Sequence, residues 1–272
     1  MSKYYFPKYL QLKQSGELDE RAEEFNQLLT HCTLCPFECG INRIEGEFGA
    51  CNAGFEPRIK SAHANFGEIP ELSGKYGCGY ISFKNELSGD EYVNESEETR
   101  EFEIEELAKQ MVSLQIRSCH NISFVTPTNY AAQVIEALSL AIEGGFILPI
   151  VWNCSGFESI RVLKLLDGIV DVYIVDFSLI RKNLSLKDNS KSAAICEAIC
   201  GAVREMFKQI TSIIINKEKI LNHGIVIRSY DEMNSFCNDT GLLTELAKEI
   251  EVKHKEGKLI IDNRKEIKNK RL

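Results

Sequence analysis

The sequence predicts an α/β fold with a small metal-binding appendage at its N-terminal end, and two patterns support this. From about residue 78 onward, short β-rich runs alternate with amphipathic helical stretches, which is typical of βα units around a parallel sheet. Before that point, a loop-rich segment carries four closely spaced cysteines. We therefore divide the chain into residues 1–77, a helical lead-in with the appendage, and residues 78–272, which carry the β/α units.

The β/α units are expected to contain six strands. These lie at residues 78–83, 121–127, 148–153, 171–177, 224–230 and 258–263. Helical patterns fall between them, at residues 102–117, 129–145, 158–168, 191–210 and 240–251. A further helix is expected around residues 17–29, and residues 211–224 suggest a short hairpin. The acidic, turn-rich residues 84–98 are expected to form an exposed loop that holds no metal.

Composition excludes several classes of function. The 272 residues are 44% hydrophobic, enough for one large domain with a small appendage. Lys and Arg total 32 against 40 Asp and Glu, so there is no basic surface for nucleic acid. Apolar runs are too short to cross a bilayer or to form a signal peptide. We therefore expect a soluble, cytoplasmic protein that has neither nucleic acid nor membrane as a partner.

Four of the ten cysteines have the spacing of a metal site. Cys32, Cys35, Cys39 and Cys51 are separated by two, three and eleven residues, and the segment is rich in glycine. Thiolates are soft ligands, and short connections allow them to converge on one ion. Both Zn²⁺ and a 4Fe-4S cluster accept four thiolates, so the spacing predicts a metal centre without fixing its metal. The alternative is four reduced, buried thiols.

Polar residues are expected at one mouth of the sheet. In a parallel barrel, functional groups gather at the carboxyl ends of the strands. The candidates for binding a polar small molecule are Thr126, Asn153, Ser155, Asp176 and Arg228. The alternative role for each is to cap a helix or close a loop. An ion pair between Asp176 and Arg228 is expected, because their strands should be neighbours.

Several stretches together resemble a known family. They are "CTLCPFECGINRIEGEFGAC", "SGKYGCGYISF", "HNISFVTPTNY", "LPIVWNCSGFESIRVLKLLDGIVDVYIVDF" and "HGIVIRS". Over about residues 30–230 the chain resembles the radical SAM superfamily, in its PflX-like group of proteins similar to pyruvate formate-lyase activating enzyme. This resemblance implies a partial (β/α)6 TIM-like barrel of the radical SAM type.

The sequence departs from this family where S-adenosylmethionine chemistry takes place. The family carries C-x3-C-x2-C after its first strand, but "KNELSGDEYV" has no cysteine. The lysine of its D-L-K motif is replaced by Ser178, and the histidine of its I-R-H motif by Ser229. The resemblance therefore implies a degenerate member, for which we expect no S-adenosylmethionine cleavage.

Three functions are consistent with these observations. The first is a catalytically degenerate, metal-binding scaffold that binds a small molecule or a protein partner. The second is an atypical iron-sulfur enzyme that uses the cysteine quartet as its 4Fe-4S site. The third is a stabilising subunit for an active relative.

Overall fold

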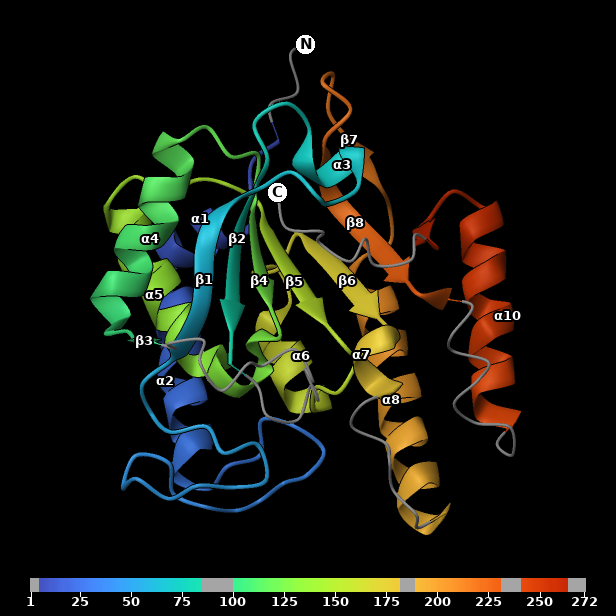
Figure 1. The fold of residues 1–272 in the computed structure, drawn as a ribbon, viewed down its shortest axis with the longest axis horizontal. Helices are drawn as coiled ribbons and strands as arrows, with labels where there is room; N and C mark the ends of the chain where they lie inside the picture. The colour runs from blue at the N-terminus through green and yellow to red at the C-terminus, as the bar shows by residue number, and fades with distance from the viewer. Residues whose placement is uncertain (1–4, 85–99, 182–188, 231–240, 264–272) are drawn as a thin grey trace, which may run out of the picture.

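The computed structural model describes residues 5–84, 100–181, 189–230 and 241–263 (Figure 1). Its strands are β1 (Arg58–Asn65), β2 (Cys78–Phe83), β3 (Arg100–Glu101), β4 (Ile122–Val125), β5 (Ile150–Cys154), β6 (Val172–Asp176), β7 (Ile214–Ile215), β8 (Leu221–Arg228) and β9 (Ile260–Asp262). They form one nine-stranded sheet in the order β3-β1-β2-β4-β5-β6-β8-β7, and β9 also pairs with β8.

Six of these strands are parallel and follow one another in chain order. They are β2, β4, β5, β6, β8 and β9. Each lies on one of the six strand segments predicted from the sequence, so that prediction is confirmed. β1 pairs antiparallel with β2, and β7 pairs antiparallel with β8 as the predicted hairpin requires. The sheet is therefore mixed, with a parallel centre.

The described helices correspond to the predicted helical stretches and add several short ones. They are α1 (Tyr9–Ser15), α2 (Glu17–Thr30), α3 (Pro70–Ser73), α4 (Ile104–Ile116), the 3-10 turn η2 (Pro127–Tyr130), α5 (Ala131–Glu143), α6 (Ile160–Leu166), α7 (Ser178–Arg181), α8 (Asn189–Gln209) and α10 (Gly241–Lys255). Local signals set their ends: a capping box of Glu103 and Glu106 begins α4, and the Ser159 side chain caps α6.

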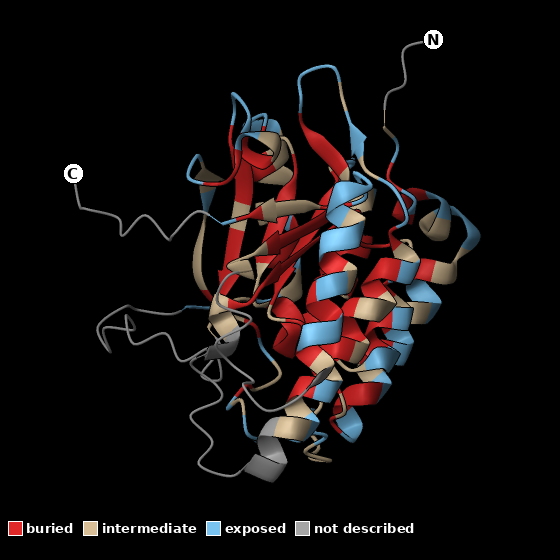
Figure 2. Cartoon of the chain, turned by 90° about the vertical axis from the view of Figure 1, so that its right-hand side faces the viewer, coloured by how far each residue is buried: buried red, intermediate tan, exposed pale blue. Residues whose placement is uncertain are grey.

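The two faces of the sheet carry different residues. Side chains alternate along each strand, so Trp152 and Tyr173 join the main core beneath the helices. Val151, Ile174 and Val226 point to the opposite face, where they form a second, smaller core with the α3 region. We call this opposite side the inner face. Figure 2 shows the strands as mostly buried, whereas the helices have exposed outer surfaces.

The α/β class is confirmed, but the sheet is not closed. The parallel strands follow strict chain order. Crossovers between parallel strands are normally right-handed, which places the connecting helices of such an order on the same face of the sheet. Because the strand order is that of an open sheet, a TIM-like barrel is not confirmed. The described chain holds no helix that is long and apolar enough to span a membrane.

The N-terminal segment packs closely on this sheet. Helix α2 confirms the predicted lead-in, and Phe25 and Leu29 of this helix belong to the main core. Strand β1 extends the sheet itself. Whether residues 1–77 form a unit of their own remains a prediction. Of the predicted acidic loop at 84–98, all but residue 84 lie outside the described residues.

Candidate functional site

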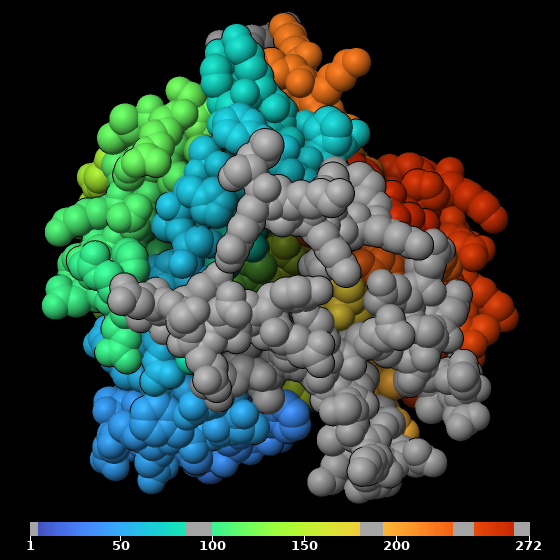
Figure 3. All heavy atoms as spheres, viewed as in Figure 1, coloured from blue at the N-terminus to red at the C-terminus, as the bar shows by residue number. Residues whose placement is uncertain are grey.

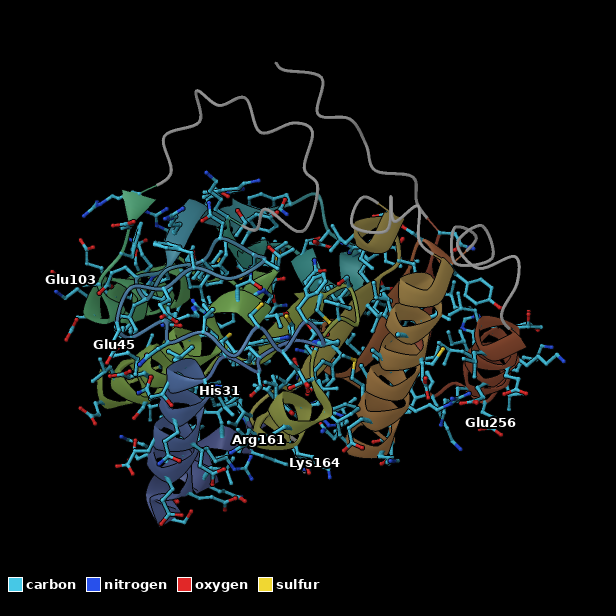
Figure 4. The ribbon with its side chains drawn as sticks, turned by 90° about the horizontal axis from the view of Figure 1, so that it is seen from below. His31, Glu45, Glu103, Arg161, Lys164 and Glu256 are labelled. Carbon is cyan, nitrogen blue, oxygen red and sulfur yellow. The ribbon has the colours of Figure 1, made fainter. Side chains whose placement is uncertain are left out.

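The cysteines lie on a loop that covers the carboxyl edge of the sheet. We call residues 31–57 the quartet segment; it forms the lower left part of the surface in Figure 3. The amide of Ser159 donates to the carbonyl of Leu34 at 3.2 Å, and the rings of Phe37 and Phe157 lie 5.1 Å apart. Because residues 157 and 159 follow β5, the segment lies against the loops of this edge. Figure 4 shows His31 and Glu45 on it, with Arg161 and Lys164 on the neighbouring α6.

Backbone hydrogen bonds and two glycines fold the quartet segment into tight turns. Cys32 donates its amide to the carbonyl of Ile41 at 2.9 Å and accepts from Gly40 at 3.1 Å. Gly40 has a φ of +67°, a conformation that favours glycine. A Cβ on Gly49 would lie 2.9 Å from the sulfur of Cys39. These glycines therefore allow the backbone to approach the cysteines closely.

The four thiols interact electrostatically. Burial raises the pKa of Cys35 to about 12, and Cys51, Cys32 and Cys39 add to this increase. Burial also raises the pKa of Cys51. The backbone amides of Phe37 and Ala53 act in the opposite direction on Cys35 and Cys51, respectively. Each of these amides lies two residues after its cysteine, which is where it can stabilise a thiolate.

The thiols are neighbours, but their arrangement is not that of a finished metal site. Within the described ranges, no three His, Cys, Asp or Glu side chains are placed to hold a metal ion. All four cysteines of the segment are free thiols. The chemistry of the donor set fits a tetrahedral metal centre, since it consists of four soft ligands on short connections. Metal binding at Cys32, Cys35, Cys39 and Cys51 thus remains a prediction.

A buried arginine lies beside the quartet. Arg43 is 0% exposed, and its guanidinium donates to the carbonyls of Asn129, at 2.5 Å, and Gly54. It also lies 5.6 Å from the centre of the Tyr130 ring. Among the described residues, no carboxylate pairs with this guanidinium, although its positive charge acts to lower the pKa of Cys51. Arg43 was not predicted as a site residue from the sequence, because nothing in the spacing of its neighbours marks it as buried.

The predicted ion pair at the mouth of the sheet is present and belongs to a larger cluster. Asp176 and Arg228 are register partners on β6 and β8, with Oδ2 and Nη1 3.8 Å apart. Arg228 also contacts Glu68, and its Nε lies 3.2 Å from Oδ2 of Asp262. Burial acts to lower the pKa of Arg228, but the three carboxylates outweigh it and raise that pKa. Arg228 is thus held as a cation by its neighbours.

The sequence analysis missed two members of this cluster. Asp262 ends β9 and lies next to the end of the sixth predicted strand, so the rule that selected Asp176 could also have found it. Glu68 lies on the loop between β1 and α3, and no strand pattern points to it. Only the folded chain brings Glu68 to Arg228.

The remaining mouth candidates lie where β4 and β5 end. Thr126 follows β4 with a φ of +53°, an unfavourable conformation for a β-branched residue, and donates its amide to the Asn153 carbonyl at 2.9 Å. Its hydroxyl donates to the carbonyls of Val125, at 2.8 Å, and Phe83. Asn153 is 3% exposed, and its Oδ1 accepts no hydrogen bond from the described part of the chain. Ser155 follows β5 and is half-buried.

A second polar cluster lies on the helix side of the same edge. Glu158 is 1% exposed and accepts a hydrogen bond from Thr128 at 2.5 Å. Burial raises the pKa of Glu158 and, more strongly, that of the neighbouring Cys154. Thr128 therefore supports a buried carboxyl group, a role that the sequence analysis did not foresee.

Comparison with known proteins gives little further information. No protein-family model matches the chain, and no solved structure matches it significantly. It is similar to an uncharacterized protein, MJ0674, of Methanocaldococcus jannaschii, with 26% identity over 176 residues that cover 59% of this chain and 49% of the relative. The chain thus spans about half the length of this curated relative. A similarity of this extent assigns neither a family nor an activity.

Proposed function

We propose that this protein is a metal-binding scaffold of radical SAM-like descent, in which Cys32, Cys35, Cys39 and Cys51 bind one Zn²⁺ ion or one 4Fe-4S cluster. The metal centre holds the quartet segment on the carboxyl edge of the sheet. Beside it, the mouth formed by Thr126, Asn153, Ser155, Asp176 and Arg228 binds a small polar molecule. The protein acts by binding this molecule or a protein partner rather than by cleaving S-adenosylmethionine.

The burial of Arg43 is the observation that carries this proposal. A guanidinium cannot lose its proton in a protein, so the burial of Arg43 with no carboxylate partner among the described residues leaves its positive charge uncompensated there. A metal centre with four thiolates carries a net charge of about −2, whether it holds Zn²⁺ or an oxidised 4Fe-4S cluster. Such a centre, formed next to Arg43 and Cys51, supplies the missing negative charge. Four neutral thiols would supply no negative charge.

The strand order supports the proposed descent. Six parallel strands follow one another in chain order, which is the arrangement of an open (β/α)6 barrel. Ser178 and Ser229 both donate their hydroxyl groups to Oδ1 of Asp176. The positions at which the family carries lysine and histidine are thus used here to fix a carboxylate. This supports a degenerate rather than a catalytic mouth.

The first test of this function is the metal content of protein purified without oxygen. One metal centre per chain is expected, and visible absorption will distinguish a cluster from Zn²⁺. Replacement of Cys32 and Cys35 with alanine should abolish metal binding, whereas Cys119→Ala, a buried cysteine outside the quartet, should retain it. A wild-type protein without metal, or a quartet variant that keeps it, would refute the metal centre.

A second test separates the scaffold from the atypical iron-sulfur enzyme. The protein is reconstituted with iron, sulfide and a strong reductant, supplied with S-adenosylmethionine, and assayed for 5′-deoxyadenosine. The scaffold predicts no product above that of the variant lacking Cys32 and Cys35. Production above this background would favour the enzyme, with one cysteine releasing its iron to open a site.

A further inference from the structure

The quartet segment buries little apolar surface against the rest of the chain. Among the large aliphatic and aromatic side chains of residues 31–57, Leu34 is fully buried, with 2% exposed. The others are half-buried or exposed, and they are Phe37, Ile41, Ile44, Phe48 and Phe55. Burial of apolar area is the main favourable contribution to packing, so apolar contacts hold this segment only weakly.

The contact beneath the segment is polar and incompletely paired. Arg43 donates to the carbonyls of Asn129 and Gly54. Nε2 of Gln133 donates to the carbonyl of Phe55 at 2.7 Å. Within the described chain, however, no hydrogen bond is made by three buried atoms of this contact, which are Nε of Arg43, Nδ2 of Asn129 and Oε1 of Gln133. A polar group that loses water without gaining a partner opposes burial, so this contact favours an open segment.

Two turns of the segment are conformationally unfavourable. Glu38 has a φ of +41° and Asn52 a φ of +50°, in the left-handed region that favours glycine. Asparagine tolerates this conformation, but glutamate seldom adopts it. Glu38 directly precedes Cys39, and Asn52 directly follows Cys51. The strain therefore lies next to two of the proposed ligands, where bonds to a metal would hold the turns in place.

We propose that the quartet segment is a metal-controlled cover, which is closed when the four cysteines bind a metal and opens as a unit when the metal is lost. This inference rests on the proposed metal centre and adds a means of regulating it. Opening exposes Arg43 and the residues beneath it, Asn129 and Gln133, while the sheet and its helices stay folded. Metal availability thereby controls how much of the carboxyl edge is accessible to a partner.

Trypsin cleavage after Arg43 measures the opening. Arg43 is the only lysine or arginine in residues 31–57, and its burial protects the bond that follows it. Metal-loaded protein and chelator-treated protein are digested under reducing conditions, and each cleavage is followed by mass spectrometry. Metal removal should speed cleavage after Arg43 about tenfold or more, because the protease samples the population of open molecules. Cleavage after the exposed Lys255, at the end of α10, should keep its rate.

The fluorescence of Trp152 separates local opening from unfolding. Trp152 is the single tryptophan of the chain and is fully buried in the main core. Its emission should stay the same when the metal is removed. A red shift on metal removal, or equal cleavage after Arg43 in samples with and without measured metal, would overturn the cover and leave the metal centre in place. Protein that never binds metal would refute both.

A glycine variant tests the strain in the metal-free protein. Glu38→Gly removes the cost of a positive φ from the closed segment, so cleavage after Arg43 should be roughly threefold slower than in metal-free wild type. Ala50→Gly is the matched control, because Ala50 lies in the same segment and has no positive φ. It should not slow the cleavage. A metal-free Glu38→Gly variant that is cleaved as fast as the wild type would overturn the inference.

Discussion

Two arginines are buried at the same edge of this sheet, and their surroundings are opposite. Arg43 is bound by carbonyl oxygens, with four thiols nearby and no carboxylate partner in the described chain. Arg228 is surrounded by Glu68, Asp176 and Asp262. One site therefore has too little negative charge for its cation, and the other has more than its cation needs.

The difference indicates which kind of group each site requires. Burying an ionised group is tolerated only when nearby charges and hydrogen bonds compensate it. An anionic metal-thiolate centre would compensate Arg43, whereas the carboxylates around Arg228 already exceed the charge of their cation. One physical rule therefore gives opposite expectations for the two arginines, and each can be tested by changing a single charge.

The largest expected effect comes from removing the quartet. Structural zinc sites supply apparent binding energies on the order of 10 kcal/mol to the unit they close. Replacing Cys32 and Cys35 with alanine should therefore lower the free energy of unfolding by several kcal/mol, measured by denaturant titration of metal-loaded protein. Chelation of the wild type should give a similar loss. If Cys119→Ala destabilises as much as the double variant, packing rather than metal binding explains the effect.

Loss of Arg228 should have the next largest effect. Arg228→Met leaves Glu68 and Asp176 without their cation, and breaking a buried pair in this way costs about 3–5 kcal/mol. The same denaturant titration measures it. Arg204→Met, at a half-exposed pair with Glu249, should cost less than about 1 kcal/mol. Similar losses for the two variants would mean that the charges around Arg228 stabilise the fold no more than a half-exposed ion pair does.

The sequence predicts the sheet well because its signals are local. The six parallel strands are short apolar runs bounded by turns, and the helices between them have a regular apolar period. The pair of Asp176 and Arg228 follows from the same reasoning, since adjacent parallel strands end at one edge. Closure of a barrel depends on whether the strands at one end of the sheet, β3 and β1, meet those at the other end, β7 and β9, which no local pattern specifies.

The partners of the buried charges were not predictable in the same way. Glu68 reaches Arg228 across 160 residues of sequence, and Arg43 reaches Asn129 across 86. Neither contact leaves a periodic signal, because each comes from a loop whose path depends on the finished fold. Sequence spacing could mark the four cysteines as candidate metal ligands, but the buried charge of Arg43 beside them became apparent only from the structure.

Asp171, a buried acid at the opposite edge of the sheet, provides a separate test of whether burial controls ionisation in this protein. Burial raises the pKa of Asp171 to about 7, although Tyr5 and the amide of Ile150 both donate to its carboxylate. The folded state therefore holds a proton that the unfolded state releases near the ordinary pKa of Asp. Stability from this group is fully present below about pH 4 and is lost as the pH rises towards 7.

The pH dependence of unfolding measures this effect. Between pH 5 and pH 7 the free energy of unfolding should fall by roughly 1 kcal/mol per pH unit more in the wild type than in Asp171→Asn. Glu249→Gln, a surface change, should keep the wild-type slope. If Asp171→Asn also keeps that slope, burial at this position does not control ionisation, and burial arguments for the two arginines lose their support.

The smallest expected effect distinguishes the two arginines directly. Arg43→Met removes two hydrogen bonds to carbonyl oxygens but leaves no carboxylate of the described chain unpaired, and it removes a buried charge. In metal-free protein these effects oppose each other, so the free energy of unfolding should change by less than about 1 kcal/mol, far less than for Arg228→Met.

In metal-loaded protein the same Arg43→Met variant removes the charge that balances the thiolates, and metal affinity should fall about tenfold or more. Arg43→Lys keeps the charge and should retain most of that affinity. A large loss of stability in the metal-free variant would show that Arg43 serves the packing of the quartet segment, and the charge argument for the metal centre would fail.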